Sequence, residues 1–181
     1  MIEPSEEVRF MANVLDLTAL VHELTTKCWN AGKKDISPQM ISLGGNYLKD
    51  LDKTKLIRTF INHSHDYWEK IRLHEEIFFI ENAHVVFQQL PIDSKNINAF
   101  KLFFTATDKD GKDIIPKGDR DAIWEIFESL VKICIKYVHR VRGVKTVVTE
   151  NGPRSAYANK DFPKVKVQEL AKLWKIDLPT S

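Results

Sequence analysis

The densest group of side chains that could do chemistry lies between residues 63 and 84. The candidate metal ligands and acid–base groups there are His63, His65, Asp66, Glu69 and His74. In a helix, His65 and Glu69 share a face at i and i+4, where together they could hold a divalent metal ion. A metal site needs more protein ligands than two, so this pair alone does not predict one.

A second motif in this stretch has the Glu-x-x-His spacing and consists of Glu81 and His84. It resembles the motif of di-iron helical bundles, and that resemblance implies a second copy of the motif and two further glutamates. The sequence contains no second copy. It also leaves open whether five of these side chains converge, namely His63, His65, Glu69, Glu81 and His84.

The dipeptide His65-Asp66 resembles the centre of the motif of HD-type metal phosphohydrolases, and the resemblance implies His22 as an earlier ligand. The chain departs from that family's pattern directly after the dipeptide. Tyr67-Trp68 stands where the family has an apolar residue followed by glycine. We therefore expect no catalytic residue, no metal and no cofactor, and we keep a metal-dependent hydrolase of helical type as a second alternative function.

Two further features could carry chemistry, and neither completes a site. Residues 107–119 have the composition of a calcium loop, but Ala106 and Lys117 occupy positions where such a loop needs oxygen ligands. Cys28 and Cys134 lie on apolar helix faces, so we expect buried free thiols. Free thiols favour a reducing compartment, which would be the cytoplasm or the nucleus.

Positive charge is concentrated toward the C-terminal end. Residues 1–129 carry 16 Lys+Arg against 21 Asp+Glu, whereas residues 130–181 carry 11 against 4. Cations recur on one face of the last long predicted helix and continue beyond it. The candidate polyanion-binding residues are Lys132, Lys136, Arg140, Arg142 and Lys145. Binding of nucleic acid or another polyanion is therefore the first alternative function.

The composition is that of an ordinary globular chain. Its 181 residues, 43% hydrophobic and 29% charged, suffice for one well-buried domain and are too few for two comfortable ones. No apolar run approaches the ~18 residues that a membrane span needs, and the acidic first residues lack the apolar core of a secretory signal. We therefore expect an intracellular protein without a membrane span.

Helical periodicity dominates the first part of the chain. Ser5 starts a first helix that Gly32 ends, and Ser37-Pro38 starts a second. We assign the buried side of the second helix to Met40, Ile41, Leu43, Tyr47, Leu48 and Leu51. Gly44-Gly45 in its middle either let a neighbouring helix approach closely or mark an interruption.

The hub of the fold is expected between Lys53 and Leu90, the stretch richest in bulky side chains. One straight helix there would be roughly 57 Å long, against a diameter of about 40 Å for a compact chain of this size. We therefore expect a break between His63 and Glu76. The Ile-Phe-Phe-Ile run at 77–80 points in all directions, which predicts burial on every side. A hairpin with residues 77–80 and 84–87 as strands is the alternative.

The remainder of the chain is expected to form shorter elements around one long helix. In order they are a short helix after Pro91 through Phe104, the loop 107–119, a long helix from Asp119 or Asp121 to Arg142, a strand over 144–149, a loop over 151–164 and a terminal helix over 165–176. The strand is β-branched and alternating. It would need an edge from another segment or another chain.

These patterns predict an all-α, single-domain bundle of five to six helices around a central buried helix, with one short β-strand near the C-terminus. We expect the bundle over 1–142 and a basic extension over 143–181 that packs on it or extends from it. Ten Phe, four Trp and four Tyr exceed what helix stripes require, and aromatic residues anchor interfaces. The predicted function is non-enzymatic protein–protein interaction, as a scaffold, adaptor or assembly subunit, with a protein partner or self-association.

Overall fold

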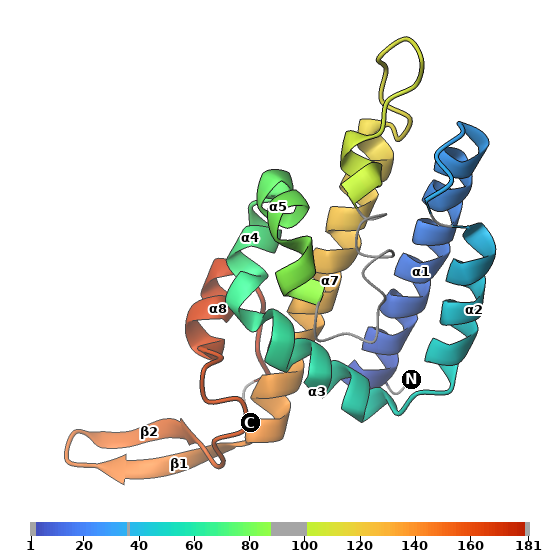
Figure 1. Ribbon diagram of the computed structural model, residues 1–181. Helices are drawn as coiled ribbons and strands as arrows, with labels where there is room; N and C mark the ends of the chain where they lie inside the picture. The colour runs from blue at the N-terminus through green and yellow to red at the C-terminus, as the bar shows by residue number, and fades with distance from the viewer. Residues whose placement is uncertain (1–2, 36, 88–100, 180–181) are drawn as a thin grey trace.

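The computed structural model describes residues 3–35, 37–87 and 101–179, without the side chains of 83–87. Within these residues the chain is mostly helical, with seven α-helices and a small antiparallel sheet of two strands near the C-terminus (Figure 1). The predicted helical bundle is thus confirmed in outline. The sheet is an addition to the all-α class.

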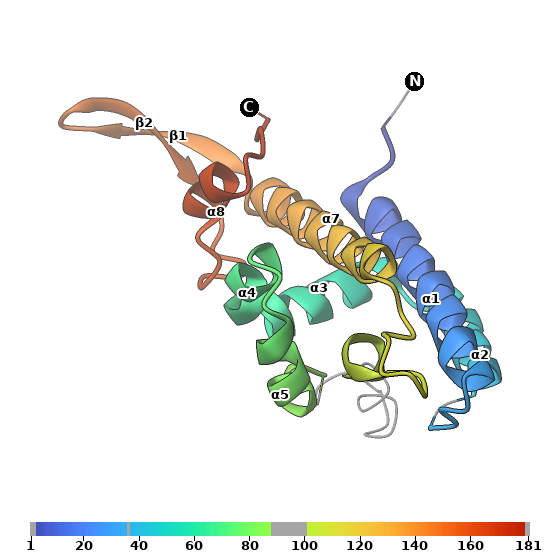
Figure 2. The same cartoon turned by 90° about the horizontal axis from the view of Figure 1, so that it is seen from above.

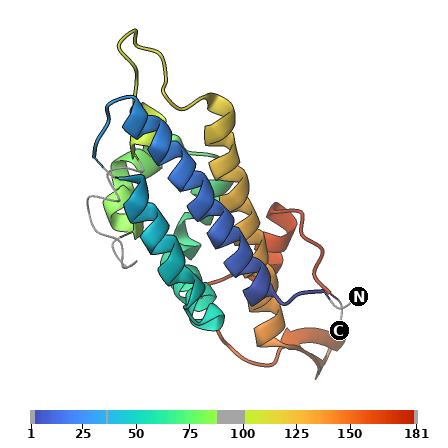
Figure 3. The same cartoon turned by 90° about the vertical axis from the view of Figure 1, so that its right-hand side faces the viewer.

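The first two helices begin at the predicted caps. In α1 (Glu6–Asn30) the Ser5 side chain accepts a hydrogen bond from the Val8 N–H, and in α2 (Pro38–Lys49) Ser37 accepts one from Met40. Both caps satisfy backbone donors that a helix start leaves unpaired. Helix α1 lies between α2 and α7 (Lys117–Arg142), as Figures 1 and 3 show.

The predicted break between His63 and Glu76 is confirmed. Helix α3 (Lys53–Ser64) gives way to a 3₁₀ turn, η1 (His65–Tyr67), then to α4 (Trp68–Arg72) and α5 (Glu76–Phe87). His74, between α4 and α5, has a positive φ of 51°, a conformation that ends a helix. Residues 77–80 are helical, so the hairpin alternative is wrong.

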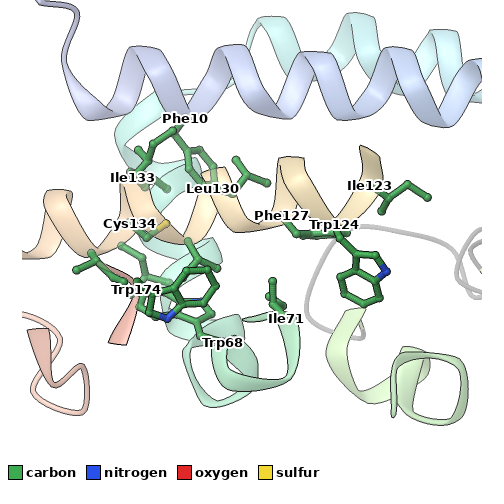
Figure 4. Close-up of a cluster of buried hydrophobic side chains, with 14 of the residues drawn as sticks. Phe10, Trp68, Ile71, Ile123, Trp124, Phe127, Leu130, Ile133, Cys134 and Trp174 are labelled. Carbon is green, nitrogen blue, oxygen red and sulfur yellow. The ribbon is translucent and has the colours of Figure 1, made fainter. Parts of the chain in front are cut away.

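The centre of the core is α7, and the hub predicted at residues 77–80 is wrong. Helix α7 packs against α1 on one side and against α4 and α8 (Val167–Leu173) on the other. Figure 4 shows Phe10 of α1 on one side of α7, and Trp68, Ile71 and Trp174 on the other. Because α7 has neighbours on both sides, most of its circumference is buried.

Helix α5 contributes one face to this core rather than its whole circumference. Phe79 is 2% exposed and packs edge-on against Trp124 at a centroid distance of 5.3 Å. Ile77 is 71% exposed. Residues two positions apart in a helix point about 200° away from each other, so Phe79 points into the core and Ile77 points outward.

The strand predicted over 144–149 is confirmed, and its partner comes from the segment predicted to be a loop. Strand β1 (Val144–Thr149) pairs antiparallel with β2 (Gly152–Tyr157), with Thr149 opposite Gly152. Gly152 has φ +97°, which suits glycine at the end of a tight turn. The hairpin projects from the helical body (Figures 1 and 2).

The segment after the hairpin returns to the body. Phe162, Val165 and Trp174 belong to the same buried cluster as the core residues of α7. The predicted terminal helix is confirmed as α8, shorter than expected, and residues 101–105 are helical. The helix expected after Pro91 lies mostly outside the described residues. The division at residue 142 stays a prediction.

Candidate functional site

The pair His65 and Glu69 does not form the start of a metal site. His65 has Nδ1 3.1 Å from the carbonyl oxygen of Ile61 and Nε2 3.2 Å from a carboxylate oxygen of Asp66. The carboxylate of Glu69 instead accepts two hydrogen bonds from Arg72, at 3.0 and 2.6 Å. These bonds lower the pKa of Glu69. The two side chains therefore serve different partners.

The remaining ligand candidates are held elsewhere. The ring of His74 stacks on Trp124 at 5.3 Å, and its Nε2 lies 2.7 Å from Glu128 Oε1. Glu81 is exposed, and the side chain of His84 lies outside the described residues. Within the described part of the chain, no three His, Cys, Asp or Glu side chains are grouped as metal ligands. A metal-dependent hydrolase stays a prediction.

The remaining ligand candidates are His22, His63 and the loop 107–119. His22 lies on α1 and His63 on α3, each half-buried. In the loop considered for calcium, Asp108 Oδ1 accepts the N–H groups of Asp110 and Lys112 at 2.9 and 3.0 Å. This carboxylate closes its own turn, as an Asx turn does.

Both cysteines are buried free thiols, as predicted. Burial raises the pKa of Cys28, and it raises the pKa of Cys134 well above its ordinary value. The thiolate is the nucleophilic form of cysteine. Neither side chain therefore has the environment of a reactive cysteine.

The two arginines predicted to bind polyanions are used inside the chain. Arg140 forms ion pairs with Glu6 and Glu7 of α1, at 2.6 and 2.7 Å. Arg142 is buried, and its guanidinium donates to the backbone carbonyls of Asp161, at 2.7 Å, and Phe162. Burial lowers the pKa of Arg142. Its position fixes the segment that returns from the hairpin.

Two of the three predicted lysines lie one helical turn apart on α7, and the third lies on the hairpin. Lys132 is 3.5 Å from Glu128 on the same helix, Lys136 is half-buried one turn later, and Lys145 is exposed on β1. The five predicted cations thus lie on α7 and the hairpin in different surroundings. Polyanion binding through these five residues stays a prediction.

Helix α2 has two apolar faces, and among the described residues one of them packs on α1 while the other is exposed. The inner face consists of Pro38, Ile41, Gly45 and Leu48, of which Pro38 and Gly45 are buried and the other two half-buried, and α2 packs against α1. Gly45 fits closely, because a Cβ there would lie 2.9 Å from the Thr18 methyl carbon. The predicted close approach of a neighbouring helix is therefore confirmed at Gly45.

The outer face of α2 consists of Met40, Leu43, Gly44 and Tyr47, and all four residues are exposed. Met40 is 56%, Leu43 64% and Tyr47 62% exposed, so their assignment to the buried side was wrong. The four follow the i, i+3, i+4, i+7 spacing of a helix face that packs on another helix. We call this set the outer α2 face.

Gly44 is the residue of this face that the chain itself does not explain. A Cβ at Gly44 would meet no atom within 4 Å, in contrast to the neighbouring Gly45. A glycine inside a helix costs about 1 kcal/mol relative to alanine. Within the part of the chain that the structure describes, no close contact therefore accounts for a glycine at this position, whereas close approach of another backbone would.

The stretch of sequence that carries the outer α2 face has no charged residue up to Leu48. Residues 36–48 contain no Asp, Glu, Lys or Arg, although 29% of the chain is charged. The solvent-exposed side of a helix is normally charged or polar, and the centres of protein interfaces are depleted in charge. The sequence held this signal, since two apolar faces can be separated on a helical wheel.

A depression of 480 Å³ lies beside α8. Its charged lining residues, Lys172, Lys175 and Asp177, are all exposed. Small-molecule sites usually combine an enclosed apolar wall with a few convergent polar groups. This depression has no buried polar side chain that would orient a ligand.

The chain matches no known protein family, no curated protein and no solved structure. The outer α2 face is therefore assigned from its own geometry alone.

Among the helices of the described residues, none combines the length and the apolar composition needed to cross a membrane.

Proposed function

We propose that this chain works through protein–protein contact and that the outer α2 face binds one amphipathic helix of a partner protein. The observation that carries the proposal is the exposure of Met40, Leu43 and Tyr47 at helical spacing around Gly44, where an added Cβ would meet no atom of the described residues within 4 Å. A helix is the occupant that matches this spacing, because its own i, i+3, i+4, i+7 side chains interlock with such a face.

The size of the face limits the interaction to a modest one. Helix α2 has 12 residues, and at 1.5 Å per residue it offers roughly 18 Å of contact length. Stable interfaces bury about 800 Å² on each partner, more than a single short helix face supplies. The proposed role is that of an adaptor or an assembly subunit with further contacts elsewhere.

A display library of helical peptides, selected on the full chain, tests the proposal. We expect selected peptides to share apolar residues at i, i+3 or i+4, and i+7. Leu43→Lys should weaken their binding at least about 10-fold, because a desolvated ammonium group would then lie in the contact. Ser42→Lys is the matched control, since Ser42 is exposed on the same helix but points about 100° away from Leu43.

Both substitutions are at exposed positions and should change the free energy of unfolding by no more than about 0.5 kcal/mol. Equal peptide binding to wild type, Leu43→Lys and Ser42→Lys would refute the proposed face. So would a selection that yields only extended peptides. A thermal melt of each variant shows that lost binding does not come from unfolding.

A further inference from the structure

The free edge of the β-hairpin carries a second inference, independent of the outer α2 face. In the described residues the sheet consists of β1 and β2 alone, and it projects from the body (Figure 2). Most of its side chains are exposed, and Val148 is 83% exposed. Each strand therefore has one edge whose backbone groups find no partner within the hairpin.

The register shows which backbone groups point outward. The N–H of Ala158 donates to the carbonyl of Gly143 at 2.8 Å, so the facing backbone groups of this pair point across the hairpin toward each other. Residues alternate along an antiparallel pair, so the outward groups of β1 belong to Val144, Thr146 and Val148. The corresponding outward residues of β2 are Pro153, Ser155 and Tyr157.

The two edges differ in their ability to accept another strand. Pro153 has no N–H, so the outer edge of β2 lacks a donor at its first outward position. The β1 edge contains no proline and carries one charge, at Lys145. Proline and charge are the usual means of blocking an edge, so β1 is the edge left open to pairing.

We infer that β1 pairs antiparallel with β1 of a second copy of this chain, with Thr146 opposite Thr146 on the two-fold axis. This register places Val144 opposite the partner's Val148, and all three outward residues then exchange both backbone bonds. Lys145 lies opposite the partner's Val147. On one face of the sheet the residues that lie opposite each other are β-branched, and on the other face no two like charges lie opposite each other. Both features favour pairing.

Neighbouring registers are less favourable. A shift of two residues in one direction sets Lys145 opposite the partner's Lys145, which is a destabilising like-charge pair. The opposite shift brings Val144 against the partner's Glu150, in the turn, and so loses one of the outward pairs. The sequence of β1 thus selects the register centred on Thr146.

The symmetric pairing also stops at two copies of the chain. Antiparallel pairing of two projecting hairpins places the two helical bodies at opposite ends of a four-stranded sheet. Its new outer edges are both β2, which Pro153 blocks. Pairing of β1 with β2 of another copy would instead be head-to-tail and could continue without limit.

Disulfide trapping in the full chain tests the inference. Thr146→Cys should form a disulfide-linked dimer of twice the 21.0 kDa chain mass, because residues in such a pair have Cα atoms about 5.5 Å apart. Ser155→Cys is the matched control on the other edge and should remain mostly monomeric. The native cysteines, Cys28 and Cys134, are buried and do not compete.

Light scattering over a range of concentrations provides the second measurement. The wild-type mass should rise toward that of a dimer, and Thr146→Pro should abolish the rise, since its N–H points away from β2 and the hairpin keeps its own bonds. Ser155→Pro should leave the rise intact. A monomer at every concentration, equal trapping at both edges, or a dimer that survives Thr146→Pro would overturn the inference. A dimer lost only with Leu43→Lys would place the contact on α2 instead.

Discussion

Helices α7 and α2 are both rich in apolar side chains, but in the described part of the chain α7 packs against helices on two sides, whereas α2 packs mainly against α1. The apolar residues of α7 are buried under α1, α4 and α8. On α2, the face toward α1 is covered and the face with Met40, Leu43 and Tyr47 is exposed. The apolar content of a helix therefore predicts how much of its surface needs to be covered, while its neighbours decide how much is covered within the chain.

The largest expected effect comes from removing a core side chain of α7. Trp124 is 1% exposed and contacts Phe79, Phe104 and Phe127. Trp124→Ala should lower the free energy of unfolding by about 3–5 kcal/mol, since it removes the transfer energy of the ring and leaves a cavity. Chemical denaturation measures this loss. A loss below about 1 kcal/mol would contradict the central role of α7.

Local features of this fold could be predicted from sequence because their causes are local. The predicted caps Ser5 and Ser37 each accept a backbone hydrogen bond within the first helical turn. The break after His63 followed from comparing a rod length with the size of a compact chain. Each of these depends on a few neighbouring residues or on chain length alone.

Features set by distant parts of the chain were missed. Arg140 pairs with Glu6 and Glu7, more than 130 residues away in sequence, and no spacing on α7 indicates that contact. The hub was placed at residues 77–80 because local hydrophobicity shows a need for burial without showing which helix supplies it.

The β2 strand and the outer α2 face had signals that were present but outweighed. Asn151-Gly152 is typical of a tight hairpin turn, yet Pro153 and the polar residues after it favour a loop. On α2, grouping all apolar residues as one buried side hid the separation between Leu43 and Ile41. In both cases the pattern allowed two structures, and packing against the rest of the chain decided between them.

The two adjacent glycines of α2 give the next largest effect, because one lies on the covered face of the helix and the other on its exposed face. Gly45→Ala should destabilise the chain by about 1 kcal/mol, because the new Cβ would lie 2.9 Å from the Thr18 methyl carbon and overpacking outweighs the gain in helix propensity. Gly44→Ala should stabilise it by about 0.5–1 kcal/mol, since a Cβ there meets no atom.

The Gly44→Ala variant should at the same time weaken binding of the peptides selected on the outer α2 face. A variant that is more stable but binds less well separates a partner contact from a structural role. Thermal melts and peptide titrations of both variants supply the comparison. Opposite signs of the two stability changes are required, and a destabilised Gly44→Ala variant would contradict the open environment of that residue.

The smallest effect concerns the surface of α7, where even an exposed cation has an intramolecular partner. Burial raises the pKa of Glu7, but its backbone hydrogen bond and its pairing with Arg140 outweigh burial and lower the pKa overall. A carboxylate with a lowered folded pKa stabilises the fold at neutral pH, and this contribution disappears as the pH falls below the ordinary value of 4.5 and through the folded pKa.

Glu7→Gln should therefore cost a few tenths of a kcal/mol up to about 1 kcal/mol at pH 7, the range of a partly exposed ion pair, and much less at pH 3. Denaturation curves of both proteins at the two pH values measure the difference. Glu3→Gln is the control, because Glu3 is exposed just before α1 and should change neither value. Equal losses at both pH values would mean that the charge of Glu7 contributes nothing to the stability of the fold.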